Sequence, residues 1–165
     1  MNLPELRSGE RVFIDANIFI YHFGGRSQQC RAMLERCARG NVLGYTATSV
    51  LAEILHRLML AEAVQTRLVT AKNAVKRLAE RPELVRRLTT YNEDVDKISQ
   101  MNLTILSLTP DIVAKSAAIR MSDGLLTNDS FVGVFMREWG LTNLATTDRD
   151  FERVAGLEVY APTDL

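Results

Sequence analysis

The sequence predicts an α/β fold in which helices flank a central, mostly parallel sheet. Short apolar runs typical of buried strands alternate with amphipathic stretches of helical periodicity, which is the pattern of parallel sheets. The chain has 165 residues, a length typical of one domain. It shows no internal repeat, low-complexity tract or linker rich in proline and glycine. We therefore expect a single domain over residues 1–165.

The first part of the chain contains two strand–helix units. Each begins with a short run of buried apolar residues and continues with a stretch of helical periodicity. Gly40 is suited to end the first of these helices. The expected elements are a strand over 11–15, a helix over 27–39, a strand over 42–46 and a helix capped by Thr48 or Ser49 that ends near Ala61.

The stretch at about 64–98 has a different character and is expected to form a helical arm. It reads as two amphipathic helical stretches, with a break near Arg81 because Pro82 is tolerated only in the first turn of a helix. A solvated helical face usually explains such a concentration of charge, and a nucleic-acid-binding arm is the alternative. The basic residues are Arg67, Lys72, Lys76, Arg77, Arg81, Arg86, Arg87 and Lys97.

The last part of the chain returns to alternating strands and helices. Pro110 is suited to open a helix, and Gly140 to close the next one. The expected elements are a strand over 103–109, a helix over 110–121, a helix capped by Thr127 or Asn128 that ends at Gly140, and short strands at 143–148 and 157–161.

Composition limits the possible functions. The 20 basic and 20 acidic side chains cancel to a formal net charge of zero, so a nucleic acid would have to be held by a local basic cluster. No apolar run approaches the roughly 20 residues that span a bilayer, and the N-terminal stretch lacks the apolar core of a signal peptide. We therefore expect a cytoplasmic protein that has no contact with a membrane.

Four acidic residues occupy corresponding places in the expected strand–helix units. Asp15 and Asp148 end strands, while Glu53 and Asp129 lie within about a turn of helix starts that follow strands. Ligands of such sheets bind at the carboxyl ends of the strands, so we expect these acids to face one crevice. Each acid alone is also explained by stabilisation near a helix N-terminus. Together they would repel one another without a cation, and Mg²⁺ or Mn²⁺ is the natural compensator because both prefer carboxylate oxygens.

Smaller polar residues near these acids are candidates for a supporting role. Asn17 lies two positions after Asp15 and can reach the same site or cap the helix that follows. Thr146 alternates with Asp148 along the strand and therefore lies on the same face. Asp150 could add a further carboxylate or cap the short helix after it.

Other common catalytic patterns are absent from the sequence. His22 and His56 do not form an HExxH or similar metal-binding pair, and no GxGxxG or GxxxxGK[ST] phosphate loop occurs. Ser49, Ser122 and Ser130 lie in no nucleophile-elbow context. The residue pattern therefore favours metal-assisted chemistry at the four acids.

Four ordered stretches carry a resemblance to a known family: FIDANIFIY, SVLAEILHRL, LLTNDSFVGVFMREWGLTNLATTDRDF and LEVYAP. Together they resemble the PIN-domain family, and in particular the VapC-type toxin ribonucleases of bacterial and archaeal toxin–antitoxin pairs. The resemblance covers nearly the whole chain, and the stretch at 64–98 is its least typical part. One departure is Ser130-Phe131, where relatives often carry Ala-Leu.

The resemblance implies a PIN-like three-layer fold and Mg²⁺- or Mn²⁺-dependent cleavage of single-stranded RNA. It also implies homodimerisation and inhibition by a cognate antitoxin. The mechanism that we expect is attack of a metal-bound water or hydroxide on a backbone phosphate, with small polar residues orienting the ligands and waters. The resemblance places the four family acids at Asp15, Glu53, Asp129 and Asp148, and the small polar positions at Asn17 and Thr146.

Contact with the RNA backbone would come from basic side chains, which add affinity but no sequence information. The candidates are Arg86 and Arg87 in the 64–98 stretch, with Arg137 and Arg149 nearer the pocket.

Two other functions stay open at this point. A haloacid-dehalogenase-like phosphatase also places an aspartate after its first strand and uses Mg²⁺, but it needs a second aspartate where this chain has Asn17. A non-catalytic PIN-like module would bind RNA or a protein and use its acids only for a structural ion. A DNA-cleaving nuclease is a variant of the main hypothesis, because no residue here is a signature for the RNA 2′-hydroxyl.

Overall fold

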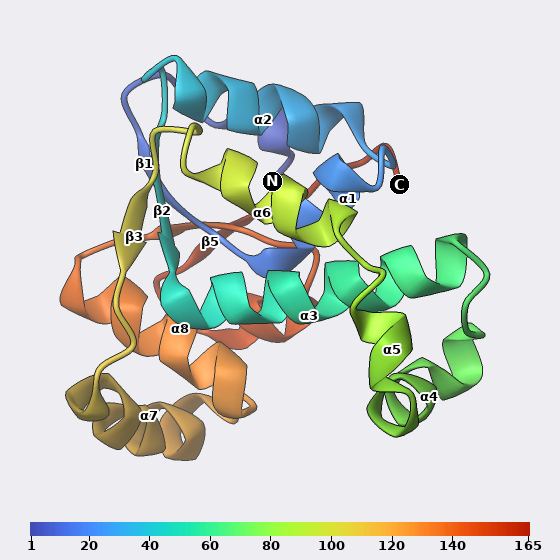
Figure 1. Ribbon diagram of the computed structural model, residues 1–165. Helices are drawn as coiled ribbons and strands as arrows, with labels where there is room; N and C mark the ends of the chain where they lie inside the picture. The colour runs from blue at the N-terminus through green and yellow to red at the C-terminus, as the bar shows by residue number, and fades with distance from the viewer.

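Five short strands form one parallel sheet at the centre of the protein. The structure is a computed structural model that describes residues 1–165, and Figure 1 shows the strands between layers of helices. The strand order is β3-β2-β1-β4-β5, and every neighbouring pair is parallel, which confirms the expected α/β fold. The strands are β1 (Arg11–Ile14), β2 (Leu43–Ala47), β3 (Thr104–Leu106), β4 (Asn143–Ala145) and β5 (Glu158–Tyr160).

The strand order reverses between β1 and β4, and this reversal positions the acids. The chain adds β2 and β3 on one side of β1 and then returns to place β4 on the other side. Because parallel crossovers are right-handed, the connections before and after the return cover opposite faces of the sheet. In such sheets ligands bind at the carboxyl edge where the order reverses. Asp15 and Thr146 directly follow the two strands that meet there.

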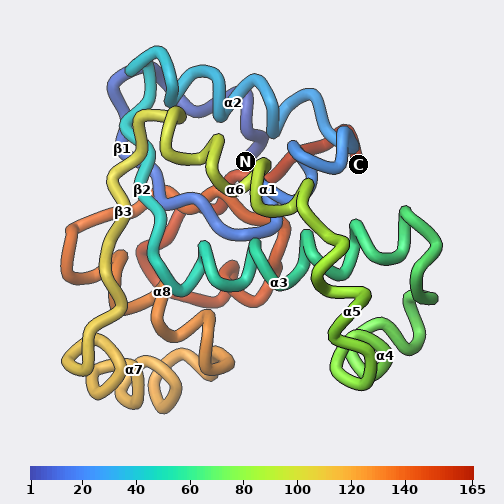
Figure 2. The backbone as a smooth tube through the Cα atoms, viewed as in Figure 1, coloured from blue at the N-terminus to red at the C-terminus, as the bar shows by residue number.

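Helices cover both faces of the sheet, which gives three layers (Figures 1 and 2). On one side α1 packs against α2 and α3, and α3 packs against α6. On the other side α7 and α8 pack together as a pair. The helices are α1 (Ala16–Phe23), α2 (Gln28–Ala38), α3 (Thr48–Gln65), α6 (Thr90–Ile98), α7 (Pro110–Asp123) and α8 (Thr127–Glu138).

The segment between α3 and α6 forms a lobe that projects from the body of the protein at the end of α3 (Figures 1 and 2). It consists of η2 (Ala71–Asn73), α4 (Ala74–Glu80) and α5 (Pro82–Val85). The predicted break near Arg81 is confirmed, but 64–98 holds three α-helices after α3 rather than two helical stretches. A small apolar cluster, separate from the main core, packs the lobe against the end of α3 and is formed by Ala63 of α3 with Leu78, Leu84 and Leu88.

The structure also corrects the boundaries of α3 and β3. α3 continues to Gln65, one turn longer than expected, and its N-cap is Ala47. The side chain of Thr48 instead accepts a hydrogen bond from the backbone N–H of Leu108 (2.9 Å). The N–H of Leu108 is thus bonded outside the sheet. The strand expected over 103–109 is limited to the three residues of β3.

The main hydrophobic core joins the sheet to both helical layers. Phe13 of β1 stacks on Phe135 of α8 with 6.1 Å between ring centroids, and both side chains are fully buried. Burial of aromatic side chains of this size makes a large contribution to the stability of a domain. None of the helices is both long and apolar enough to cross a membrane.

Replacing Gly44 with alanine is expected to destabilise the fold, because β2 passes very close to its neighbours there. An added Cβ would overlap Cδ2 of Leu103 and lie 3.0 Å from Sγ of Cys37 and 3.1 Å from Cδ1 of Ile14. Overpacking of this kind costs about 1–3 kcal/mol, which urea unfolding of Gly44→Ala would measure. Adding Leu103→Ala removes the overlapping atom. The double variant should therefore lose less free energy of unfolding than the two single variants lose in sum. Simple additivity would contradict this account of the site.

Candidate functional site

Asp15 stands at the carboxyl end of β1, where it caps α1. Its Oδ1 accepts a hydrogen bond from the backbone N–H of Ala16 (2.7 Å). Its Oδ2 accepts from the side-chain amide of Asn17 (2.6 Å) and from the hydroxyl of Thr146 (2.7 Å). Three donors therefore hold this carboxylate in one orientation at the reversal of the strand order.

Thr146 connects the ends of β1 and β4. Its side chain is fully buried, and its hydroxyl accepts hydrogen bonds from Asn17 Nδ2 (2.9 Å) and from the backbone N–H of Asp148 (3.0 Å) while it donates to Asp15. Asn17 Oδ1 accepts in turn from the backbone N–H of Thr147 (3.1 Å). The structure thus brings Asp15, Asn17, Thr146 and Asp148 into one hydrogen-bonded group.

Asp148 begins the short helix η3 (Arg149–Arg153) as its N-cap. Its Oδ1 accepts from the backbone N–H of Asp150 (2.8 Å). The prediction that Asp150 could cap this helix is wrong, because Asp148 precedes the first helical residue and is the N-cap. The Asp150 carboxylate instead pairs with Arg153 (3.2 Å) and does not join the hydrogen-bonded group.

Glu53 and Asp129 bring two further helices to the same place. Glu53 lies in the second turn of α3, and Asp129 is the third residue of α8. The cap of α8 is the backbone of Leu126, which corrects the expected capping by Thr127 or Asn128. A small cavity of about 10 Å³, enough for roughly one water or ion, separates the acids. It is lined by Asp15, Ser49, Val50, Glu53, Asn128, Asp129 and Val132.

The four carboxylates share one electrostatic environment. Burial, together with the negative charges of Asp148, Asp15 and Glu53, raises the pKa of Asp129 from 3.8 to about 6. Burial likewise raises the pKa of Asp15; its hydrogen bonds oppose that rise, and the charges of Glu53 and Asp148 add to it. The negative charges of Glu53 and Asp148 therefore lie close enough to disfavour the ionised forms of Asp15 and Asp129.

The donors at this site suit a hard divalent cation in kind. They are carboxylate oxygens from four segments, they repel one another, and a small cavity lies among three of them. No group of three Asp, Glu, His or Cys side chains in the chain is arranged closely enough to hold an ion as it stands. Enclosing Mg²⁺ or Mn²⁺ would therefore require the acids to move together.

Three residues near the acids were not predicted to belong to the site. Ser49 and Asn128 line the cavity. Arg57 pairs with Glu53, with 3.3 Å between Nη1 of Arg57 and Oε1 of Glu53. Ser49 and Arg57 are four residues before and after Glu53, so helical spacing alone predicts that the three side chains share a face of α3. Asn128 precedes Asp129 in the first turn of α8 and has no comparable signal in the sequence.

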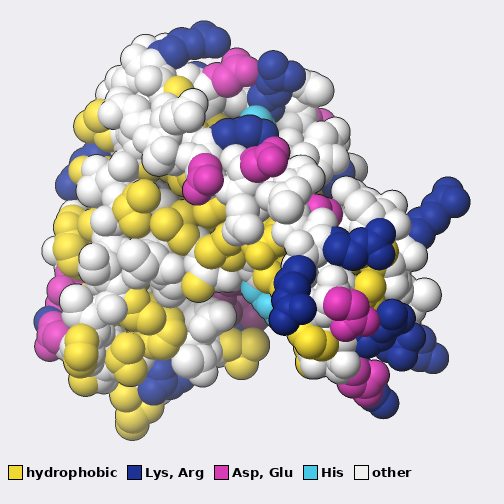
Figure 3. All heavy atoms as spheres, in the orientation of Figure 1, with side chains coloured by type: hydrophobic (Ala, Val, Ile, Leu, Met, Phe, Trp, Pro, Cys, Tyr) yellow, Lys and Arg dark blue, Asp and Glu magenta, His cyan; other side chains and the backbone are white.

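The four arginines expected to contact RNA lie in different places. Arg137 is in the last turn of α8, pairs with Asp123 (2.5 Å) and lines a cavity that contains none of the acids. Arg149 is exposed at the start of η3. Arg86 and Arg87 are exposed after α5 and form no ion pair, whereas other basic residues of the lobe pair with nearby glutamates. Figure 3 shows Lys and Arg side chains gathered on this lobe.

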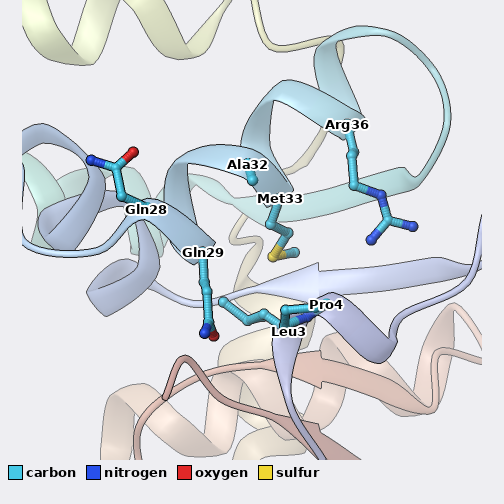
Figure 4. A pocket seen from close by; sticks show the side chains of 7 residues that line it. All are labelled: Leu3, Pro4, Gln28, Gln29, Ala32, Met33 and Arg36. Atoms are coloured by element: carbon cyan, nitrogen blue, oxygen red, sulfur yellow. The ribbon is translucent and has the colours of Figure 1, made fainter. Parts of the chain in front are cut away.

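A larger groove, of about 540 Å³, lies away from the acids between η1 (Leu3–Glu5) and α2 (Figure 4). Leu3 and Met33 are buried beneath it, and Arg36 at its edge donates to the backbone carbonyl of Leu6 (2.6 Å). The groove contains no acidic side chain, so its size does not mark the place where the predicted chemistry would occur. Its lining residues are Leu3, Pro4, Gln28, Gln29, Ala32, Met33 and Arg36.

The sequence is similar to known proteins over most of its length. Residues 12–157 match the family model of the PIN domain. The chain is also 25% identical over 151 residues to Ribonuclease VapC2 of Methanocaldococcus jannaschii, an alignment that covers 90% of this chain and 92% of that protein.

Three solved structures illustrate the proteins to which the fold is similar. VapBC2 of Rickettsia felis, bound to a promoter DNA fragment, matches with a TM-score of 0.58 and 15% identity over 92% of this chain and 98% of that one. A toxin–antitoxin complex from Klebsiella pneumoniae matches with a TM-score of 0.56 and 17% identity over 93% and 99% of the two chains. VapC20 of Mycobacterium tuberculosis, a toxin that cleaves the sarcin-ricin loop, matches with a TM-score of 0.53 and 17% identity over 90% and 98%. At these identities the likeness is one of fold.

Proposed function

Because this chain belongs to the PIN-domain family, we propose that it is a divalent-metal-dependent nuclease that hydrolyses single-stranded RNA, as the toxin of a toxin–antitoxin pair. The observation that carries the proposal is the convergence of Asp15, Glu53, Asp129 and Asp148 from four segments of the chain. The relative from M. jannaschii, a ribonuclease by name, supports the reaction class. The family match favours this reaction over a phosphatase.

The residues of the site have distinct roles in the proposed reaction. Mg²⁺ or Mn²⁺ held by the four acids would polarise the scissile phosphate and lower the pKa of a water molecule. Asn17 and Thr146 keep the Asp15 carboxylate facing the cavity through two hydrogen bonds. Thr146 also fixes the start of the segment that carries Asp148, because it accepts that residue's backbone N–H. Supporting residues of this kind orient metal ligands and set their spacing.

Basic side chains outside the acidic cavity are proposed to hold the RNA backbone. Arg149 is next to Asp148 in the sequence, and Arg86 and Arg87 are free of ion pairs on the exposed lobe. Contacts of this kind add affinity that falls with increasing salt concentration. Arg137 is a weaker candidate, because its guanidinium already pairs with Asp123.

The proposed partners are a second copy of the chain and a cognate antitoxin. One of the similar structures, from K. pneumoniae, is described as a toxin–antitoxin complex. A toxin made in the cell without its antitoxin would degrade the RNA of its own host, so a protein inhibitor is expected to accompany a nuclease of this kind.

Cleavage of total cellular RNA and tRNA by the purified full chain tests the proposed reaction. We expect cleavage with Mn²⁺ or Mg²⁺ that stops in EDTA and is lost in Asp15→Asn. Asp111→Asn is the matched control, because Asp111 is an exposed acid on α7 that pairs with Lys115 outside the site. RNA binding without cleavage in any metal would favour the non-catalytic module instead.

A further inference from the structure

Arg57 is the one basic residue that pairs with any of the four acids. Its Nη1 lies 3.3 Å from Oε1 of Glu53, one turn earlier on α3. No Lys, Arg or His forms an ion pair with Asp15, Asp129 or Asp148. Arg57 is therefore the only basic side chain in direct ionic contact with one of the four acids.

Arg57 lies one helical turn beyond the residues of α3 that line the cavity. Ser49 and Glu53 line the cavity from α3, and Arg57 continues the same helix face by one further turn. The Arg57 side chain is 51% exposed, and the pair with Glu53 uses only one of its guanidinium nitrogens. The remaining N–H groups can donate to an anion that approaches from solvent.

The pair is weak enough to be exchanged. An exposed i,i+4 ion pair contributes little to stability, whereas a divalent ion is attracted by several carboxylates at once. Glu53 is held toward Arg57 in this arrangement, and no three of the acids are close enough together to enclose an ion. Binding of an ion would therefore compete with Arg57 for the Glu53 carboxylate.

We propose that Arg57 is the resident counter-charge of the acidic site, which holds Glu53 in the ion-free protein and releases it when a divalent ion binds. The released guanidinium then donates to a backbone phosphate of the RNA, whose oxygens it can contact with two parallel N–H groups. This inference rests on the proposed nuclease function and adds a residue to it.

Two variants separate the effects expected from this role. Arg57→Ala should bind Mn²⁺ about three- to fivefold more tightly than the wild-type protein, because it removes both the competitor for Glu53 and a repelling charge. Arg57→Lys keeps the charge and should stay within about twofold of the wild type. For cleavage of a fluorogenic single-stranded RNA at saturating Mn²⁺, Arg57→Ala should raise KM about three- to tenfold and change kcat by less than about threefold.

Mn²⁺ binding is measured directly, by electron paramagnetic resonance of the free ion, so it does not depend on activity. Arg39→Ala is the matched control, because Arg39 forms an i,i+4 pair of the same length (3.3 Å) with Glu35 on α2, away from the acids. It should change neither Mn²⁺ affinity nor KM. Asp129→Asn provides the reference for a damaged ion site.

Each outcome bears on a different part of the account. If Asp129→Asn weakens Mn²⁺ binding but Arg57→Ala leaves it unchanged or weaker, the role of Arg57 is overturned while the nuclease proposal stands. Tighter Mn²⁺ binding in Arg57→Ala without a rise in KM would overturn the phosphate contact. If the wild-type protein binds no Mn²⁺, the proposed function fails and this inference fails with it.

Discussion

Asp129→Asn is expected to abolish RNA cleavage and at the same time to make the ion-free protein more stable at neutral pH. The loss of cleavage should reach about a thousandfold, because the variant removes one of the four carboxylates proposed to hold the ion. The gain in stability follows from the pKa of Asp129, which burial and the neighbouring acids raise from 3.8 to about 6. Ionising this side chain is therefore less favourable in the folded protein than in the unfolded chain.

The pH dependence of the stability gain has a definite sign. Below pH 3.8 both states hold the proton, and the variant and wild type should differ little. Between pH 3.8 and about 6 the folded state keeps the proton that the unfolded state loses, so the free energy of unfolding falls as pH rises. Above about pH 6 the wild type bears the full loss of folding free energy that comes from ionising Asp129 in the folded state. Because the side chain is only partly buried, we expect a difference of about 1–2 kcal/mol at pH 7.

Urea unfolding in EDTA at pH 4, 5, 6 and 7 would measure this difference. Saturating Mn²⁺ should make the wild type the more stable protein at pH 7. The ion stabilises the folded wild type by binding to it, whereas the site that would bind it is damaged in the variant. Asp111→Asn, which removes an exposed acid outside the site, should cleave RNA at the wild-type rate. A variant that is equally or less stable than wild type at pH 7 in EDTA would show that burial and the neighbouring acids do not disfavour ionisation of Asp129 as described.

Thr146→Val is expected to lower cleavage by about 10- to 100-fold and to destabilise the protein by about 1–3 kcal/mol. The substitution keeps the shape of the side chain but removes the hydroxyl that bonds Asp15, Asn17 and the backbone N–H of Asp148. Because Thr146 is fully buried, water cannot easily replace these bonds. The Asp15 carboxylate would lose one of its three donors and with it part of its fixed orientation.

Thr146→Ser distinguishes the hydroxyl from the packing of the methyl group. The serine variant keeps the hydrogen-bonding oxygen, so its cleavage rate should stay within a few-fold of the wild type, even if the lost methyl group costs some stability. Equal loss of cleavage in the serine and valine variants would mean that the network does not position the acids.

The strands and the acids at their ends could be predicted because each depends on a local pattern. A run such as Val12–Ile14 is buried whatever its neighbours, and Asp15 after it must lie at the carboxyl edge of the sheet. The strand order depends on contacts between distant segments, which no local pattern encodes. The reversal between β1 and β4, which brings Thr146 to Asp15, therefore emerged only from the structure.

The arginines show where reasoning from the sequence was limited. Arg137 shares α8 with Asp129, but eight residues at about 1.5 Å each separate them by about 12 Å along the helix. Its partner Asp123 comes from the end of α7, a contact that depends on how the two helices pack. The pairing of Arg57 with Glu53, by contrast, could have been predicted, because the two residues are four apart on a helix that the sequence predicts.

The measurement that tests the central claim most directly is Mn²⁺ binding by the wild-type chain and by four variants, each with one acid neutralised. The claim is that Asp15, Glu53, Asp129 and Asp148 form one cation site. We predict that the wild type binds Mn²⁺ and that Asp15→Asn, Glu53→Gln, Asp129→Asn and Asp148→Asn each weaken binding by about tenfold or more, while Asp111→Asn does not. Wild-type affinity in all four variants, or no Mn²⁺ binding by the wild type, would contradict the claim.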